Sequence, residues 1–315
     1  MSKRIPVIVA GISEPQANDP TLLVATELAR ARGAELHLVH TFQLPPVMGG
    51  LGIEVALPAG YQTYAGMLQD SLEAAARALP GGESARCRVV LGPPAPALAG
   101  IAERVHADLL VVGAARGSRL GRALLGTTAQ RVLRESRVPV LVARRPVTGP
   151  PDRVLLTTDL SPLSAAVHQT ALETIEALLG RPGRLRSLLV IGWTVAPPPL
   201  DTAAVDRAVR SELDAFLSAL GPGVPRVEPV VRSGFTGDEI AAEALEWDAD
   251  LLVVGTHARG WGARMMLGSV AEAAVRDAPC NVLVVPPVPV AAYTEPAVEP
   301  SRDSAEVEAC LGAGI

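Results

Sequence analysis

The sequence predicts an α/β protein in which two doubly wound parallel sheets, each of five strands, follow one another along the chain. The strongest observation is an internal repeat: residues 107–113 read ADLLVVG, and residues 249–255 repeat them letter for letter, 142 positions later (249 − 107). Residues 140–142 and 282–284 both read Val-Leu-Val at the same offset. The length of 315 residues suits two domains, and the 49% hydrophobic content supplies their cores. The chain is therefore predicted to be a duplication.

The duplication predicts domain 1 at residues 1–146 and domain 2 at residues 152–287. Between them, residues 145–152 are rich in Pro and Gly and are typical of a short linker. After domain 2, residues 288–315 carry acidic side chains and no sustained apolar period. We expect this last segment to be a flexible tail.

Strand and helix signals alternate along domain 2. Residues 154–158 form a short apolar run, which suits a strand buried on both faces. Ser161 is expected to cap a helix over residues 162–179, which has Pro at its first position and Gly180 after it. The later strands are expected at residues 188–191, 227–231, 251–254 and 281–285, and the later helices at residues 206–220, 238–246 and 270–276. Domain 1 follows the same order with an added loop near residues 45–60. This alternation predicts a parallel sheet covered by helices on both faces.

Composition excludes several classes of function. A net charge of −5 and a pI near 5.6 argue against a partner role for nucleic acid. No apolar run approaches the length of about 20 residues that a membrane helix needs, and no secretory signal is apparent, so we expect a cytoplasmic protein with no membrane partner.

Lys3 is the only lysine, which excludes a phosphate-binding lysine inside the fold. The cysteines and histidines show no metal-ligand spacing, and His40 and His168 are interpreted as a strand-end and a helix-surface residue.

Ligands of such sheets bind outside the carboxyl ends of the strands, where the strand order reverses. In domain 2 the loop that follows the repeated strand is rich in Gly and leads into a helix, whose free N–H groups favour an anion. The candidates for phosphate contact here are Gly255, Thr256, His257, Ala258, Arg259, Gly268, Ser269 and Val270.

Helix capping is the alternative explanation for part of this pattern. Ser269 with Glu272, and Thr127 with Gln130, each match a capping box, which alone accounts for a hydroxyl at that place. Capping alone and capping combined with phosphate contact both remain open. His257 is more often an exposed loop residue than a phosphate ligand.

A second candidate segment lies at the end of the first strand of domain 2. Thr157 and Asp159 stand there, and a carboxylate at this place accepts hydrogen bonds from a ribose in dinucleotide folds. A turn or helix-start role for Asp159 is the alternative. Domain 1 has Gly11 and Ser13 in the corresponding segment and no acid at the matching position.

Together, these features resemble the universal stress protein family, over nearly the whole chain up to about residue 287, as a tandem pair. The resemblance implies flavodoxin-like sheets (of the adenine nucleotide alpha hydrolase-like type) with strand order 3-2-1-4-5, and pairing of the two domains through their last strands. In one subclass of the family it implies ATP binding through a Gly-x2-Gly-x9-Gly-Ser/Thr loop. Carried over, Asp159 matches the acid near the nucleoside, Gly255 the first loop glycine, and Gly268 with Ser269 the terminal pair.

Both domains depart from that loop at its second glycine, which is Ala258 in domain 2 and Arg116 in domain 1. A methyl group at this place obstructs close approach of the backbone to phosphates. We therefore expect ATP mainly in domain 2, and we expect Ala258→Gly to strengthen its binding. The weaker site expected in domain 1 consists of Gly113, Arg116, Gly126 and Thr127.

The leading hypothesis is a regulatory protein of the stress response that binds ATP or a related adenine nucleotide, with or without Mg²⁺. Little or no catalysis is expected, at most slow ATP hydrolysis, because no second carboxylate or triad accompanies the loop. The alternative is a tandem interaction module that binds no nucleotide and acts through protein partners. The two domains are expected to pair within the chain, which is also compatible with a homodimer.

Overall fold

The computed structural model describes most of both predicted domains. The described residues are 4–43, 58–114, 126–192, 202–221, 224–256 and 268–286. The predicted tail and most of the loop near residues 45–60 lie outside them.

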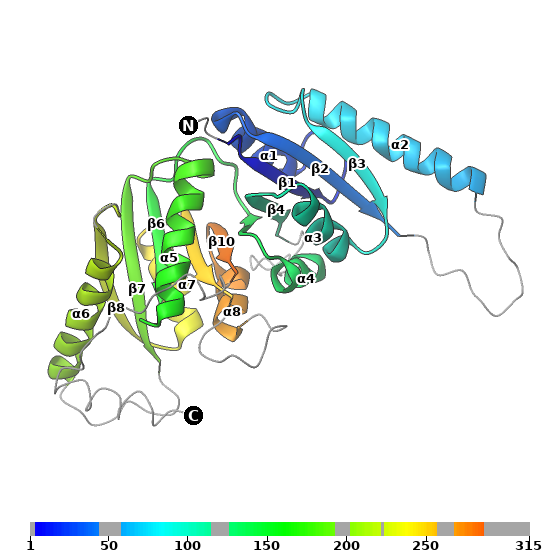
Figure 1. Ribbon diagram of the computed structural model, residues 1–315. Helices are drawn as coiled ribbons and strands as arrows, with labels where there is room; N and C mark the ends of the chain where they lie inside the picture. The colour runs from blue at the N-terminus through cyan, green and yellow to red at the C-terminus, as the bar shows by residue number, and fades with distance from the viewer. Residues whose placement is uncertain are drawn as a thin grey trace, which may run out of the picture.

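Strands and helices alternate through both halves of the chain (Figure 1). The first half, called repeat 1, contains β1 (Val7–Ile12), α1 (Pro20–Arg32), β2 (Glu35–Phe42), α2 (Pro58–Arg77), β3 (Arg86–Leu91), α3 (Pro94–Arg104), β4 (Leu109–Gly113), α4 (Thr127–Glu135) and β5 (Val140–Ala143). The second half, called repeat 2, contains β6 (Arg153–Thr158), α5 (Pro162–Thr174), the π-helix η1 (Ile175–Leu179), β7 (Arg184–Gly192), α6 (Thr202–Ala219), β8 (Val227–Gly234), α7 (Thr236–Glu246), β9 (Leu251–Gly255), α8 (Ser269–Asp277) and β10 (Asn281–Val285). Every element predicted for the second half is present, and Ser161 caps α5 as expected.

The described strands form one ten-stranded sheet in the order β3-β2-β1-β4-β5-β10-β9-β6-β7-β8. Each repeat thus has the order 3-2-1-4-5 that the family resemblance implies. Neighbouring strands within each repeat are parallel, whereas β5 and β10 pair antiparallel. The strand order reverses between β1 and β4 in repeat 1 and between β6 and β9 in repeat 2. In open sheets of this kind, ligands bind outside the carboxyl ends of the strands at such a point.

The seam between the repeats is nearly symmetric. Leu141 of β5 lies opposite Leu283 of β10, and these two residues are equivalent under the 142-residue offset of the duplication. Gln130 and Glu272 are also equivalent, and the Gln130 Nε2 atom donates to Glu272 Oε1 at 3.3 Å. An approximate twofold axis therefore passes through the β5–β10 pair. The two points at which the strand order reverses lie on either side of it.

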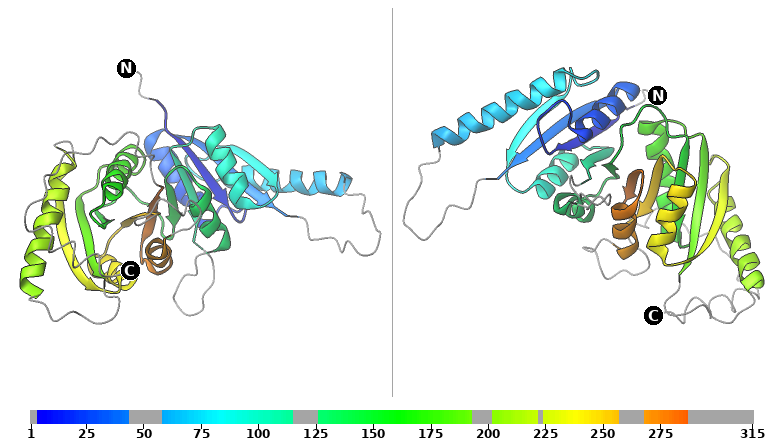
Figure 2. Two further views of the ribbon diagram at one scale, coloured as in Figure 1. Left: turned by 60° about the horizontal axis from the view of Figure 1, so that its bottom comes forward. Right: turned by 180° about the vertical axis from the view of Figure 1, so that it is seen from behind.

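Two apolar cores cover the faces of the sheet, as expected for strands that are hydrophobic throughout. Helices α3, α4, α7 and α8 contribute buried residues to one core, and α1, α2 and α5 with η1 contribute to the other. The two views in Figure 2 show helices on both sides of the sheet. Among the described residues, no helix combines the length and the apolar character needed to cross a bilayer.

The aspartate inside the repeated ADLLVVG motif has a structural role. Asp108 Oδ2 accepts a hydrogen bond from the Val7 amide at 2.8 Å, and Asp250 Oδ2 accepts one from the Arg153 amide at 2.9 Å. Each carboxylate ties the start of its repeat's first strand to the start of the neighbouring strand. This contact lies at the amino edge of the sheet, opposite the expected ligand-binding edge.

Candidate functional site

The carboxyl edge of repeat 2 opens where β6 and β9 separate. Their pairing ends with Leu156 opposite Val253. Beyond it, the Thr157 hydroxyl donates to the Val253 carbonyl at 3.1 Å. The half-buried side chain of Thr157 thus bridges the two strands at the point where their order reverses.

Asp159 follows β6 and organises the start of α5. Its Oδ1 atom accepts from the Ser161 amide at 3.0 Å, from the Ser161 hydroxyl at 2.6 Å and from the Ser164 hydroxyl at 2.5 Å. Between them, Leu160 adopts a left-handed conformation with φ of 61°, and its amide donates to the Thr158 hydroxyl at 2.9 Å. The helix-start role of Asp159 is therefore observed. The network fixes its half-buried carboxylate at the end of the strand.

Repeat 1 contains the same pair of groups with their positions exchanged. Ser13 stands where Asp159 stands in repeat 2, and Asp19 caps α1 where Ser161 caps α5. The Ser13 hydroxyl donates to Asp19 Oδ2 at 3.1 Å. Asp19 is fully buried, whereas Asp159 is half-buried. The role of Asp19 was not predicted, although an Asp directly before Pro20 is a recognisable helix-start signal.

Helices α8 and α4 begin without a side-chain cap among the described residues. Their N-cap residues are Gly268 and Gly126, so Ser269 and Thr127 occupy the first helical positions rather than the cap. Both hydroxyl side chains are exposed. The first N–H groups of these helices have no partner within the helix, so they remain suited to water or an anion.

The two predicted capping boxes are therefore wrong. A capping box needs its hydroxyl at the N-cap, and glycine occupies that position in both helices. The Gln130 and Glu272 side chains, which the boxes would use, contact each other across the seam.

The ends of the predicted phosphate loop of repeat 2 are held together. Thr256 is buried; its amide donates to the Val285 carbonyl at 3.2 Å, and its carbonyl accepts from the Gly268 amide at 2.9 Å. This brings Gly255 and Thr256 next to the start of α8, which contains Ser269 and the half-buried Val270.

Packing accounts for the glycine at the end of the repeated strand. A Cβ atom on Gly255 would lie 3.2 Å from Val167 Cγ2, and one on Gly113 would lie 2.7 Å from Thr21 Oγ1. A larger residue than glycine would therefore require Thr21 to shift in repeat 1, and Val167 to move by a few tenths of an ångström in repeat 2.

Several predicted contacts lie outside the described residues. His257, Ala258 and Arg259 belong to the segment 257–267, and Arg116 belongs to the segment 115–125. Both departures from the family's loop pattern thus fall in these segments.

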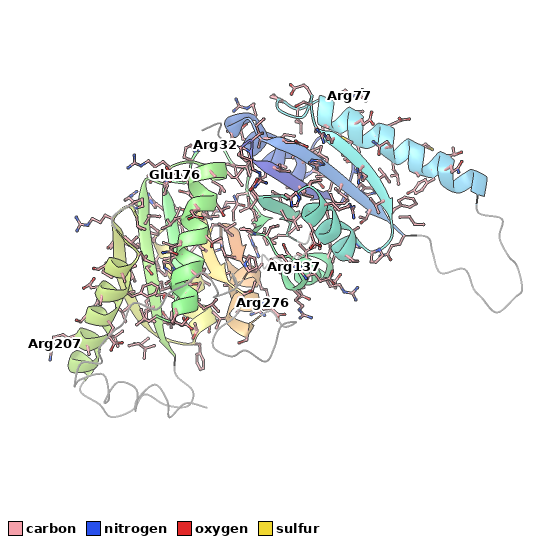
Figure 3. The ribbon with its side chains drawn as sticks, viewed as in Figure 1. Arg32, Arg77, Arg137, Glu176, Arg207 and Arg276 are labelled. Carbon is pink, nitrogen blue, oxygen red and sulfur yellow. The ribbon has the colours of Figure 1, made fainter. Side chains whose placement is uncertain are left out.

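A cavity of about 1480 Å³ opens at the carboxyl edge of repeat 1. Gly113, Gly126 and Thr127 line it, which brings together three of the four residues predicted for the weaker site. Repeat 2 supplies another part of its wall, including Arg276 from the end of α8. Figure 3 labels Arg276 near the place where the repeats meet.

His168 lies beneath the Asp159 network and is fully buried, so its assignment to the helix surface is wrong. The Nδ1 atom lies 2.8 Å from the Ser164 carbonyl, and Nε2 lies 3.0 Å from the Ser187 hydroxyl. Because a carbonyl only accepts, Nδ1 carries the proton and Nε2 accepts from the hydroxyl. Burial lowers the pKa of His168 to about 4, so the ring is neutral at pH 7.

Metal and thiol chemistry find little support among the described residues. They contain no group of three or more His, Cys, Asp or Glu side chains arranged to hold a metal ion. Burial raises the pKa of both Cys87 and Cys280 to about 11, which keeps these thiols protonated and unreactive.

Comparison with protein families gives two matches along the chain. The model described as "Universal stress protein family" matches residues 4–144 and 151–286. A universal stress protein of Mycobacterium tuberculosis is 32% identical over 194 residues, which cover 59% of this chain and 66% of that relative. A second one from the same organism is 31% identical over 211 residues, covering 64% and 68%. The first match thus spans slightly less than two thirds of that relative's length.

Solved structures show the same fold over most of the chain. A putative universal stress protein from Pseudomonas aeruginosa aligns with a TM-score of 0.62 and 19% identity, covering 90% of this chain and 94% of that one. A universal stress protein from Archaeoglobus fulgidus aligns with a TM-score of 0.59 and 20% identity, covering 89% and 98%. At these identities the likeness concerns the fold alone.

Proposed function

This chain belongs to the universal stress protein family, and we propose that it is a regulatory protein of the stress response that binds ATP or a related adenine nucleotide at the carboxyl edge of repeat 2. The family supports the stress-response role. The nucleotide and its place are our inference from the geometry of the edge.

The uncapped start of α8 is the observation that carries the proposal. The exposed Ser269 hydroxyl and the first N–H groups of α8 lie beside Thr256, at the edge where the strand order reverses. A helix of nine residues presents a partial positive charge at this end. These groups suit the phosphates of a nucleotide, which need several donors and a positive potential.

Asp159 supports recognition of the sugar. Ser161 and Ser164 hold its carboxylate at the strand end, the place from which an acidic residue contacts ribose in dinucleotide folds. Ser13 stands at the matching place in repeat 1, and Asp19 is fully buried there. We therefore assign nucleoside selectivity to repeat 2.

The proposal includes little or no catalysis. Backbone amides and a hydroxyl hold phosphates but are poor proton donors and acceptors at neutral pH. If Mg²⁺ accompanies the nucleotide, it would supply charge neutralisation of the phosphates.

Two matched substitutions test the proposal by calorimetric titration with ATP. Ser269 and Thr127 occupy equivalent first-turn positions, both are exposed, and neither caps its helix, so Ser269→Ala and Thr127→Ala should both fold normally. Ser269→Ala should weaken the repeat 2 site about tenfold, because one hydrogen bond to a charged phosphate is lost. Thr127→Ala should leave the affinity of that site unchanged. Asp159→Ala should also weaken it, but this change disturbs the start of α5 as well.

Two results would contradict the proposal. If Thr127→Ala, and not Ser269→Ala, weakens the tightest ATP site, the nucleotide belongs to repeat 1. If the wild-type protein gives no heat and ATP does not raise its melting temperature, the protein is an interaction module that acts through protein partners.

A further inference from the structure

The outer edge of β3 ends the sheet on the side of repeat 1 (Figure 1). The Gly92 amide donates to the Phe42 carbonyl of β2 at 3.0 Å, so the backbone groups of even-numbered residues in β3 point toward β2. Because these groups alternate in direction along a strand, those of Cys87, Val89 and Leu91 point outward. An edge with such a row of outward donors and acceptors is a template for pairing with another strand.

A side chain of α2 occupies this edge. Gln69 Oε1 accepts from the Val89 amide at 3.1 Å, and Gln69 Nε2 donates to the Cys87 carbonyl at 3.0 Å. The side-chain amide of Gln69 therefore takes the place that a peptide group of a neighbouring strand would take. Its Nε2 atom also donates to Glu73 Oε1 at 2.8 Å, one turn later on α2. These partners fix the orientation of the amide, because only its oxygen can accept and only its nitrogen can donate.

Repeat 2 protects its outer edge in another way. Pro229 of β8 is equivalent to Cys87 under the 142-residue offset, and it lies opposite Ser187 of β7, as Cys87 lies opposite Leu38 of β2. Proline has no amide hydrogen, and a sheet tolerates it on an edge strand where that position faces outward. Both outer edges of the ten-stranded sheet therefore carry a feature that hinders strand pairing. In repeat 1 that feature is a single side chain.

The β3 sequence is compatible with pairing to β3 of a second copy. In an antiparallel pair centred on Val89, Cys87 of one copy would lie opposite Leu91 of the other, and Arg88 opposite Val90. No arginine of β3 would then face another arginine directly, and Leu91, which is 44% exposed in the single chain, would gain an apolar neighbour. The seam inside the molecule already joins two equivalent strands, β5 and β10, in antiparallel fashion.

We propose that the outer edge of β3 is a pairing surface for β3 of a second copy of this chain, and that Gln69 closes it by occupying the backbone groups of Cys87 and Val89. The closed edge keeps two copies from joining their sheets there. This inference is independent of the nucleotide proposal, because it concerns the outer edge of repeat 1 and does not involve Asp159 or the start of α8.

Light scattering coupled to size-exclusion chromatography, over a series of protein concentrations, tests the proposal. Gln69→Leu removes the side-chain amide and keeps a good helix former at this position. Its molar mass should rise to about twice that of the wild type at high concentration, because two copies pair through the opened edge. Gln69→Ala, which adds no large apolar group, should give the same result.

Two further variants separate edge pairing from apolar contact between helices. Gln62→Leu adds the same apolar group at another, exposed glutamine of α2 and should keep the molar mass of the wild type. Cys87→Pro, combined with Gln69→Leu, copies Pro229 of repeat 2. It removes an outward donor, so it should return the molar mass to that of the wild type.

Hydrogen exchange locates the contact and checks the fold. In Gln69→Leu the Val89 amide should exchange faster than in the wild type at low protein concentration, and it should be protected again at high concentration, where it pairs. The Val111 amide, in the interior strand β4, should stay protected in every variant, which shows that the sheet remains folded.

Three results would overturn the proposal. Gln69→Leu and Gln69→Ala could both keep the molar mass of the wild type, which would show that the opened edge does not pair. Gln62→Leu could associate as strongly as Gln69→Leu, or the combination of Gln69→Leu with Cys87→Pro could still associate. Either of these would place the contact on the surface of α2 instead of the edge of β3.

Discussion

At the scale of single residues, each repeat has one serine and one aspartate in contact at the start of its first helix, but the two residue types have exchanged positions. The exchange of Ser13 and Asp19 for Asp159 and Ser161 moves the carboxylate from a buried cap to the end of a strand. The sequence alone could place Asp159 at the strand end. It could not show which atoms Asp159 contacts, because its contacts with Ser161 and Ser164 depend on the left-handed conformation of Leu160 between the strand and the helix.

His168 shows the same limit of sequence reasoning. Its burial depends on two polar partners, the Ser164 carbonyl and the Ser187 hydroxyl, and Ser187 lies on a different element. A polar residue in a helix is usually assigned to the surface, and the sequence does not reveal a partner on a neighbouring strand.

His168 predicts a measurable loss of stability in mild acid. Its pKa is about 4 in the folded protein and near 6.5 in the unfolded chain, so the unfolded chain binds more protons between these values. The contribution of His168 is therefore complete above pH 6.5 and should fall by about 3 kcal/mol as the pH drops to 4. Urea unfolding at pH 7 and pH 4.5 measures it, with His168→Gln as the variant that cannot titrate. Equal losses in the two proteins would show that His168 does not titrate as described.

At the scale of elements, strand positions were predictable but some boundaries were not. The structure begins β7 at Arg184, earlier than the predicted apolar run at residues 188–191. Arg186 lies within this extension, pairs with Glu228 and Glu243, and stacks over Trp247 at 4.5 Å. A charged residue lies in a strand here because partners from β8 and α7 surround it, which a local sequence pattern does not show.

Side chains cap the starts of α1 and α5 but not those of α4 and α8. Substitutions at the capped starts should therefore lower the free energy of unfolding more than substitutions at the uncapped ones. Asp19→Ala and Ser161→Ala should each lower the free energy of unfolding by about 1–2 kcal/mol, because Asp19 accepts from the first-turn amides of Thr21 and Leu22 and Ser161 accepts from that of Ser164. Thr127→Ala and Ser269→Ala should change it by less than about 0.5 kcal/mol, since neither hydroxyl caps a helix. Urea unfolding of the four variants measures the difference. If Ser269→Ala lowers the free energy of unfolding as much as Ser161→Ala does, Ser269 caps α8 after all and the predicted capping box is correct.

At the scale of the whole molecule, the sequence alone predicts the duplication, but it does not predict that β5 and β10 pair to join the two five-stranded units into one sheet. The β5 and β10 sequences are apolar like those of the interior strands, so composition did not mark them as an interface. Their pairing was expected only from the family resemblance, and the structure confirms it. The pairing is asymmetric, because Asn281 contacts the amide of Arg144 while the equivalent positions, 139 and 286, are both proline. The sequence shows these differences, but their effect on the seam is apparent only once β5 and β10 are known to pair.

Asn281 should matter to the stability of the whole chain. Asn281→Ala leaves two backbone amides at the seam, those of Arg144 and Arg145, without their acceptor, which should cost about 1–3 kcal/mol. Gln130→Ala removes a single long contact across the same seam and should cost less than about 0.5 kcal/mol. Urea unfolding measures both, and equal effects would mean that the contacts of Asn281 do not stabilise the pairing of β5 with β10.

We propose that an adenine nucleotide lies between Asp159 and the start of α8. A crystal structure of the protein with a non-hydrolysable ATP analogue bound tests this placement. Phosphate oxygens should lie within hydrogen-bond distance of the Ser269 hydroxyl and the first amides of α8, with the ribose beside Asp159. An analogue bound only at the edge of repeat 1, or no analogue at either edge at saturating concentration, would contradict it.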